Sequence, residues 1–105
     1  MGDKYALSDT THPDYKNLVR VIALRDIPEF GVLKGDLGGY VSGTHNLAQA
    51  GAAWIMDNAV ARDKAYICDN ALARDSALLE DNAKVCGSAI LSGTRVVKGF
   101  DFIKW

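Results

Sequence analysis

Three groups of residues in this chain of 105 residues could do chemistry: a histidine spaced regularly from aspartates, a pair of cysteines, and a series of aspartates. His45 precedes Asp63 by 18 positions, and Asp81 follows after another 18. A histidine beside a carboxylate can act as a general base, so His45 is a candidate catalytic residue. The second histidine, His12, precedes Pro13 and has no partner that the sequence identifies.

The two cysteines, Cys68 and Cys86, are also 18 positions apart. If this spacing is one structural period, their Cα atoms lie about 5 Å apart, a separation that a disulfide tolerates. Two thiols are too few ligands for a zinc site, and no histidine shares their spacing. We expect free thiols in a reducing cytoplasm, with no metal and no cofactor.

The aspartates repeat at the same interval, Asp57 with Asp75 and Asp63 with Asp81. A calcium site needs several oxygen ligands that converge on one point, whereas this pattern distributes carboxylates around separate corners. Aspartate tolerates the backbone angles of turns. We therefore expect these residues to form corners of the chain.

The element that positions these residues is a repeat of six. Alanine recurs at every sixth position, with a small or acidic turn former two positions before it and usually an apolar residue two positions after it. Such a fixed period is typical of a short strand followed by a corner. Because side chains alternate along a strand, the alanine and the following apolar residue both point inward, and three sides close a triangular coil of 18 residues. The alanines are Ala53, Ala59, Ala65, Ala71, Ala77, Ala83 and Ala89.

The hexad Ile55–Val60 resembles the aliphatic-x-x-x-small-x repeat of left-handed parallel β-helices. The preceding sequence is similar to the YdcK-type family of prophage and bacterial hexapeptide-repeat proteins. The matching residues lie in Val21–Asp26, Lys34–Val41 and Asn46–Ile55, and the resemblance covers roughly residues 18 to 92. It implies the fold of the family, which has no well-established activity to transfer.

The sequence thus predicts an all-β protein: a single-stranded left-handed parallel β-helix of about three coils over residues 37–105, with an N-terminal β-hairpin cap in residues 1–36. Both parts belong to one compact domain. Arg95 and Asp101 take inner positions of the last coil, where a solenoid end meets solvent. The predicted inner columns are Ile55/Ala73/Leu91, Ala61/Leu79/Val97 and Gln49/Ile67/Val85/Ile103.

The outward positions form columns as well, and two of them are apolar. Contiguous exposed apolar patches usually mark interfaces. We expect the N-terminal segment to cover at least one column but not both. The three columns are Trp54/Leu72/Ile90, Val60/Leu78/Val96 and Ala48/Tyr66/Lys84/Phe102, and the predicted interface comprises Trp54, Leu72, Ile90, Val60, Leu78, Val96, Tyr66 and Phe102.

Charge and hydropathy limit the possible partners. The 12 basic and 13 acidic residues are scattered, so the basic patch of a nucleic-acid binder is missing. The longest apolar run, Val21–Leu24, is far too short to span a membrane, and the N-terminus lacks an apolar signal core. We expect a cytoplasmic protein that binds neither nucleic acid nor membrane.

These observations favour a non-enzymatic protein-binding module that self-associates as a homodimer or trimer through an apolar face and binds a host protein. The family resemblance implies a phage or prophage origin and an inhibitor of a host machine, such as an anti-CRISPR-like inhibitor of a defence system. One alternative is a minimal acyltransferase-like enzyme that uses His45. Hexapeptide-repeat acyltransferases commonly carry loop insertions, and this chain has none between Ala50 and Gly99. The other alternative is a purely structural oligomer.

Overall fold

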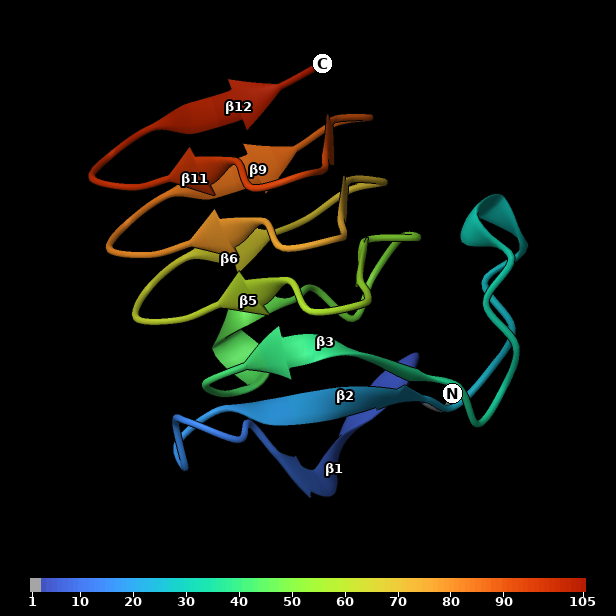
Figure 1. Cartoon of the computed structure of the whole chain (residues 1–105). Coiled ribbons are helices and arrows are strands. Elements are labelled where there is room, and N and C mark those ends of the chain that lie inside the picture. Colours follow the sequence, from blue (N-terminus) through green and yellow to red (C-terminus); the bar gives the residue numbers. More distant parts are fainter. Residues whose placement is uncertain (1–2) are drawn as a thin grey trace.

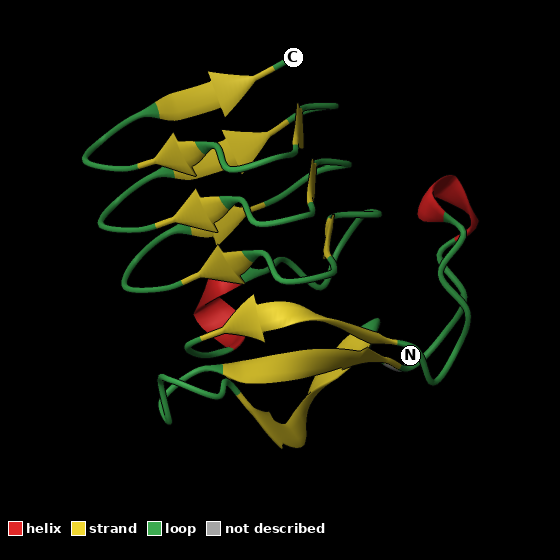
Figure 2. Cartoon of the chain, viewed as in Figure 1, coloured by secondary structure: helices red, strands yellow, loops and turns green. Residues whose placement is uncertain are grey.

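A computed structural model describes residues 3–105 as a stack of short parallel strands, a β-solenoid of about 4 turns (Figure 1). The predicted all-β parallel β-helix is confirmed, with about one turn more than predicted. Within residues 3–105 the only helices are two short 3-10 segments, η1 (Pro28–Phe30) and η2 (Thr44–Asn46) (Figure 2). The strands are β1 (Tyr5–Thr11), β2 (Val19–Ala23), β3 (Leu37–Val41), β4 (Trp54–Ile55), β5 (Val60–Ala61), β6 (Tyr66–Ile67), β7 (Leu72–Ala73), β8 (Leu78–Leu79), β9 (Lys84–Cys86), β10 (Ile90–Leu91), β11 (Val96–Val97) and β12 (Phe102–Lys104).

The strands form the three sides of the solenoid. One side is the sheet β4-β7-β10, and a second is β6-β9-β12. The third side, β5-β8-β11, continues through β3 into the antiparallel strands β2 and β1, so the predicted N-terminal hairpin caps one end. In the regular turns, parallel partners such as Trp54 and Leu72 lie 18 positions apart, which confirms the period.

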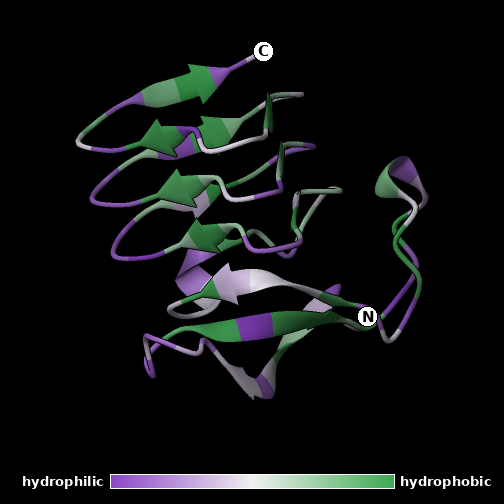
Figure 3. Ribbon diagram, viewed as in Figure 1, coloured by the Kyte–Doolittle hydropathy of each residue, from purple (hydrophilic) through white to green (hydrophobic). Residues whose placement is uncertain are grey.

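The interior follows from the hexads. The repeated alanines are at most 1% exposed, and so are the inner columns Ile55/Ala73/Leu91 and Ala61/Leu79/Val97. Each turn therefore presents small and aliphatic side chains to the same narrow core. Figure 3 shows the result: the short strands are hydrophobic and the corners between them are mostly hydrophilic.

Aspartates occupy five successive corners with φ between 56° and 59°, a left-handed conformation that few residues other than glycine adopt readily. Each carboxylate also accepts a hydrogen bond from the backbone N–H one turn later. The predicted corner role is confirmed, and the carboxylates hold successive turns together. The Oδ2···N pairs are Asp57–Asp75 (3.2 Å), Asp63–Asp81 (3.1 Å), Asp69–Gly87 (2.9 Å), Asp75–Gly93 (2.9 Å) and Asp81–Gly99 (3.0 Å).

The first turn is irregular. Leu47 pairs with Ile67, 20 positions later, whereas Ile67 pairs with Val85, 18 positions later. The prediction that Gln49 lies in this inner column is therefore wrong, because Leu47 fills it. Gln49 instead clamps the hairpin: its Oε1 accepts from the backbone N–H of Lys4 (2.8 Å) and its Nε2 donates to the carbonyl of Tyr5 (3.0 Å).

Two side chains of the hairpin complete the cap. Lys4 is 1% exposed and donates from Nζ to the carbonyl of Ala53 at 2.5 Å. The Tyr5 hydroxyl donates to the carbonyl of Leu47 at 2.6 Å. Burial, with a smaller effect of Arg25, lowers the pKa of Lys4 to about 8, and burial raises the pKa of Tyr5 to about 12.

Residues 24–36, here called the arm, leave the sheet between β2 and β3 and carry η1. In Figure 1 the arm stands apart from the hairpin, beside the solenoid. A short antiparallel bridge between Ile27 and Val32 closes it on itself. Both of these residues are buried in the hydrophobic core cluster, so the arm packs on the solenoid.

Candidate protein-binding surface

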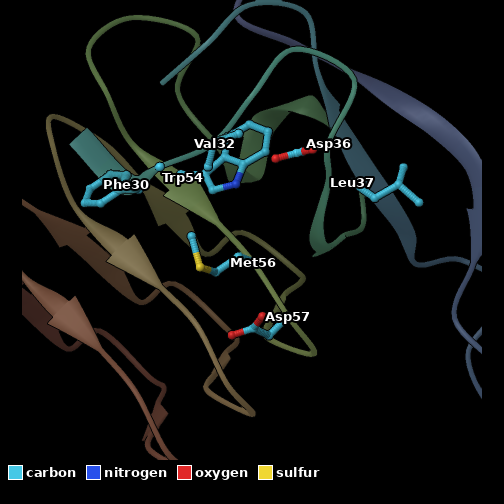
Figure 4. Close-up of a pocket in the computed structure, with 8 residues that line it drawn as sticks. Phe30, Val32, Asp36, Leu37, Trp54, Met56 and Asp57 are labelled. Atoms are coloured by element: carbon cyan, nitrogen blue, oxygen red, sulfur yellow. The ribbon is translucent and has the colours of Figure 1, made fainter. Parts of the chain in front are cut away.

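The arm covers part of the first predicted interface column. Trp54 is 1% exposed and Leu72 is 5% exposed, whereas Ile90 at the far end is 44% exposed. A cleft of about 320 Å³ lies between arm and solenoid, with Phe30 and Val32 beside Trp54 (Figure 4). The prediction that the N-terminal segment covers at least one column is therefore confirmed only in part, because Ile90 stays exposed. Trp54 and Leu72 are consequently not accessible to a partner in this structure.

The cleft has only two carboxylates among its side chains, and both are already hydrogen-bonded to the backbone. Its polar side chains are Asp36, which Figure 4 shows next to the Trp54 ring, and Asp57, which lies away from the aromatic side chains. Asp36 Oδ2 accepts from the N–H of Leu33 at 2.9 Å, and Asp57 Oδ2 accepts from the N–H of Asp75 at 3.2 Å. Both carboxylates therefore bond the backbone, and the other side chains that line the cleft are hydrophobic.

His45 lies in η2, at the same corner as Asp63. Its Nε2 is 2.7 Å from the backbone carbonyl oxygen of Asp63. Since a carbonyl can only accept, Nε2 carries the hydrogen. The Asp63 carboxylate is engaged elsewhere, with the N–H of Asp81. The predicted stacking of His45 above Asp63 is present, but the histidine bonds the backbone and not the carboxylate.

The second column is partly covered near the hairpin. Val60 and Leu78 are half-buried, whereas Val96 is 50% exposed. Beside this side, the second histidine, His12, packs edge-on against Tyr40, with ring centroids 4.6 Å apart. This column, like the first, becomes accessible toward its C-terminal end.

An ion pair spans two turns on the same side. Arg62 donates to Glu80 at 2.6 Å, and this hydrogen bond is the main cause that raises the pKa of Arg62. The Arg62 guanidinium also lies 5.9 Å from the ring centroid of Tyr15, in the loop between β1 and β2. The pair thus links the hairpin loop to the middle of the solenoid.

The third column contains Tyr66, which is half-buried, and Phe102, which is 61% exposed. Beside it, Cys68 and Cys86 form a disulfide with Cα atoms 4.7 Å apart. Their stacking confirms the predicted register. The prediction of free thiols is wrong for this structure, because neighbouring turns bring the two sulfur atoms within bonding distance.

Exposed apolar side chains gather in residues 90–105, here called the C-terminal coil. Ile90, Val96 and Phe102 were predicted at the interface, but Phe100 (85% exposed) and Trp105 (64% exposed) were not. Phe100 follows Gly99, at a corner position that carries asparagine, serine, threonine or lysine in the preceding hexads. An aromatic residue at that position is the signal that sequence reasoning missed.

The C-terminal coil also has an open backbone edge. Its strands β10, β11 and β12 each pair on one side, with β7, β8 and β9 respectively. No strand within residues 3–105 pairs with their other side. The exposed apolar side chains therefore lie next to backbone groups that can bind a further strand.

The C-terminal coil differs from the rest of the chain in its balance of basic and acidic side chains. Residues 90–105 carry Arg95, Lys98 and Lys104 against Asp101, whereas residues 1–89 carry nine basic and twelve acidic side chains. Part of the difference lies at the corners, where Gly93 and Gly99 replace the aspartates of earlier turns. The open end is thus both apolar and positively charged.

Comparisons with protein-family models, with curated proteins and with solved structures find no match to this chain. Among the described residues, no helix is long and apolar enough to cross a membrane.

Proposed function

We propose that this protein is a non-enzymatic protein-binding module whose binding surface is the C-terminal coil. The observation that carries the proposal is the coincidence of exposed apolar side chains with an unpaired strand edge at one end of the solenoid. Exposed apolar patches mark interfaces, and unpaired edges bind strands. The opposite end is closed by the hairpin.

This proposal narrows the surface expected from sequence. The arm occupies much of the Trp54 column, so binding along a whole apolar face gives way to binding at one end. A host protein as partner, a role as phage inhibitor and the YdcK-type resemblance are consistent with such a module and stay predictions. Self-association, which was also expected from the sequence, likewise stays a prediction.

The test compares two aromatic variants in the C-terminal coil, Phe100→Ser and Phe102→Ser, with the control Leu33→Ser on the arm. Leu33 is 62% exposed, close to the 61% of Phe102. Light scattering over a concentration series measures self-association, and affinity capture from a host-cell lysate measures partner binding. We expect the two coil variants to lose one or both activities while Leu33→Ser keeps them. Equal behaviour of all three variants would contradict the proposal.

A further inference from the structure

Of the three open edges in the C-terminal coil, β12 is the best suited to accept another strand. It spans three residues, whereas β10 and β11 span two each. Its inward residue Ile103 is only partly buried, while the corresponding Leu91 and Val97 are 0% and 1% exposed. A strand added at β12 would therefore cover core surface as well as pair backbone groups.

The backbone of β12 is already ordered for such pairing. Phe102, Ile103 and Lys104 are in parallel register with Lys84–Cys86 below them. The chain beyond β12 is tied down too, because the carbonyl of Trp105 accepts from the N–H of Ser88 at 2.7 Å. An edge that is fixed before binding loses little conformational entropy when a partner arrives.

The hydrogen-bond pattern identifies which amides are free. In this sheet the N–H of Tyr66 donates to the carbonyl of Ala83, and the N–H of Lys84 donates to the carbonyl of Asp101, one turn higher each time. By the same alternation, the N–H groups of Phe102 and Lys104 face the open end. These two amides are the donors for a further strand.

We propose that the β12 edge binds an extended acidic-apolar peptide segment of another protein by strand addition. In the solenoid each side chain stacks over the residue one turn below, as Ile103 does over Val85. In a parallel strand added above β12, an apolar side chain would lie beside Phe102, an aliphatic one would cover Ile103, and a carboxylate would lie beside Lys104. Main-chain bonds supply affinity in this mode, and alternate side chains supply specificity.

Charge favours this occupant over a second copy of the chain. Residues 90–105 carry Arg95, Lys98 and Lys104 against Asp101, and Lys84 pairs with Phe102 of β12. Two copies stacked end to end would bring like charges together, whereas an acidic segment neutralises them. The inference rests on the proposed function and names the partner class of the same surface.

The test uses a short fluorescent peptide with blocked ends and the central sequence Phe-Val-Glu between threonines. Control peptides replace its glutamate by lysine, or its valine by proline, which removes a backbone donor. Fluorescence anisotropy measures affinity for the wild-type chain and for Lys104→Glu. We expect binding by wild type, a loss of at least about tenfold in Lys104→Glu, recovery of that variant by the lysine peptide, and no binding of the proline peptide.

Hydrogen exchange supplies a readout specific to strand pairing. On binding, the amides of Phe102 and Lys104 should become protected, while that of Ile103 is protected throughout. Peptide binding without this protection, or equal affinity of wild type and Lys104→Glu, overturns the proposal. So does displacement of the peptide by a second copy or by a single-stranded oligonucleotide. Failure of the peptide to bind, with host-partner capture still sensitive to Phe102→Ser, overturns the strand-addition mode and leaves the proposed function standing.

Discussion

Replacing Leu79 by alanine should strongly destabilise the solenoid. Leu79 is 0% exposed and stacks in the inner column between Ala61 and Val97. The substitution removes three carbons, worth about 2.4 kcal/mol at about 0.8 kcal/mol each. The neighbour below is only an alanine, so the cavity collapses incompletely and we expect a total loss of about 3–4 kcal/mol in the free energy of unfolding.

The matched control is Leu78→Ala, one position earlier in the same strand. Leu78 points outward and is half-buried, so we expect a loss of about 1 kcal/mol. Urea denaturation followed by circular dichroism, with the disulfide intact in every sample, measures both values. Equal losses, or a larger loss for Leu78→Ala, would refute the assignment of inward and outward positions.

Three further predictions concern the corners, the cap and the disulfide. Asp75→Asn keeps an acceptor at φ 58° and should leave the melting temperature nearly unchanged. Asp75→Ala should lower the free energy of unfolding by about 1–2 kcal/mol. Similar melting temperatures for the two variants would contradict the role of the aspartate ladder. Lys4 loses its proton near pH 8 when folded but near 10.5 when unfolded, so stability should rise with pH across that window, and Lys4→Met should abolish the rise. Tyr5 acts oppositely, since its folded pKa of about 12 removes stability between pH 10 and 12; a pH series of urea midpoints tests both. Reduction of the Cys68–Cys86 disulfide should lower the free energy of unfolding by about 3 kcal/mol or less without changing the circular-dichroism spectrum; a lost β spectrum would show that the turns depend on the bond.

The regular turns could be predicted because each hexad contains both the corner residue and the inward-pointing residues of one side. Alanine and the aliphatic residue that follows it point inward wherever the pattern occurs, as at Ala77 and Leu79. The corners were predictable for the same reason, since aspartate or glycine precedes every side. Local sequence suffices when the same local interactions repeat.

The first turn could not be predicted in this way. Its extra residues are explained by contacts of Gln49 with Lys4 and Tyr5, which lie more than forty positions away. A six-residue pattern does not predict contacts between residues that are so far apart in the sequence. Extending the hexad period backward therefore assigned Gln49 to the position that Leu47 occupies.

The candidate surface was predictable only in part. Outward positions such as Ile90 and Phe102 followed from the alternation of side chains. The burial of Trp54 did not, because it depends on how the aperiodic arm packs against the solenoid. Which outward side chains are exposed depends on tertiary packing. In this structure they are most exposed in the coil farthest from the hairpin.

The aspartate ladder has a direction, and direction matters during synthesis. In every pair the carboxylate belongs to the earlier turn and the N–H to the later one. A nascent chain that ends after one turn leaves carboxylates in water, where they are well solvated, and each emerging turn finds its acceptors already in place. Gly87, Gly93 and Gly99, which have no side-chain acceptor, end the three columns of the ladder. The direction of the ladder thus suits assembly during synthesis, in which the hairpin emerges first and each later turn is added at the end nearest the ribosome.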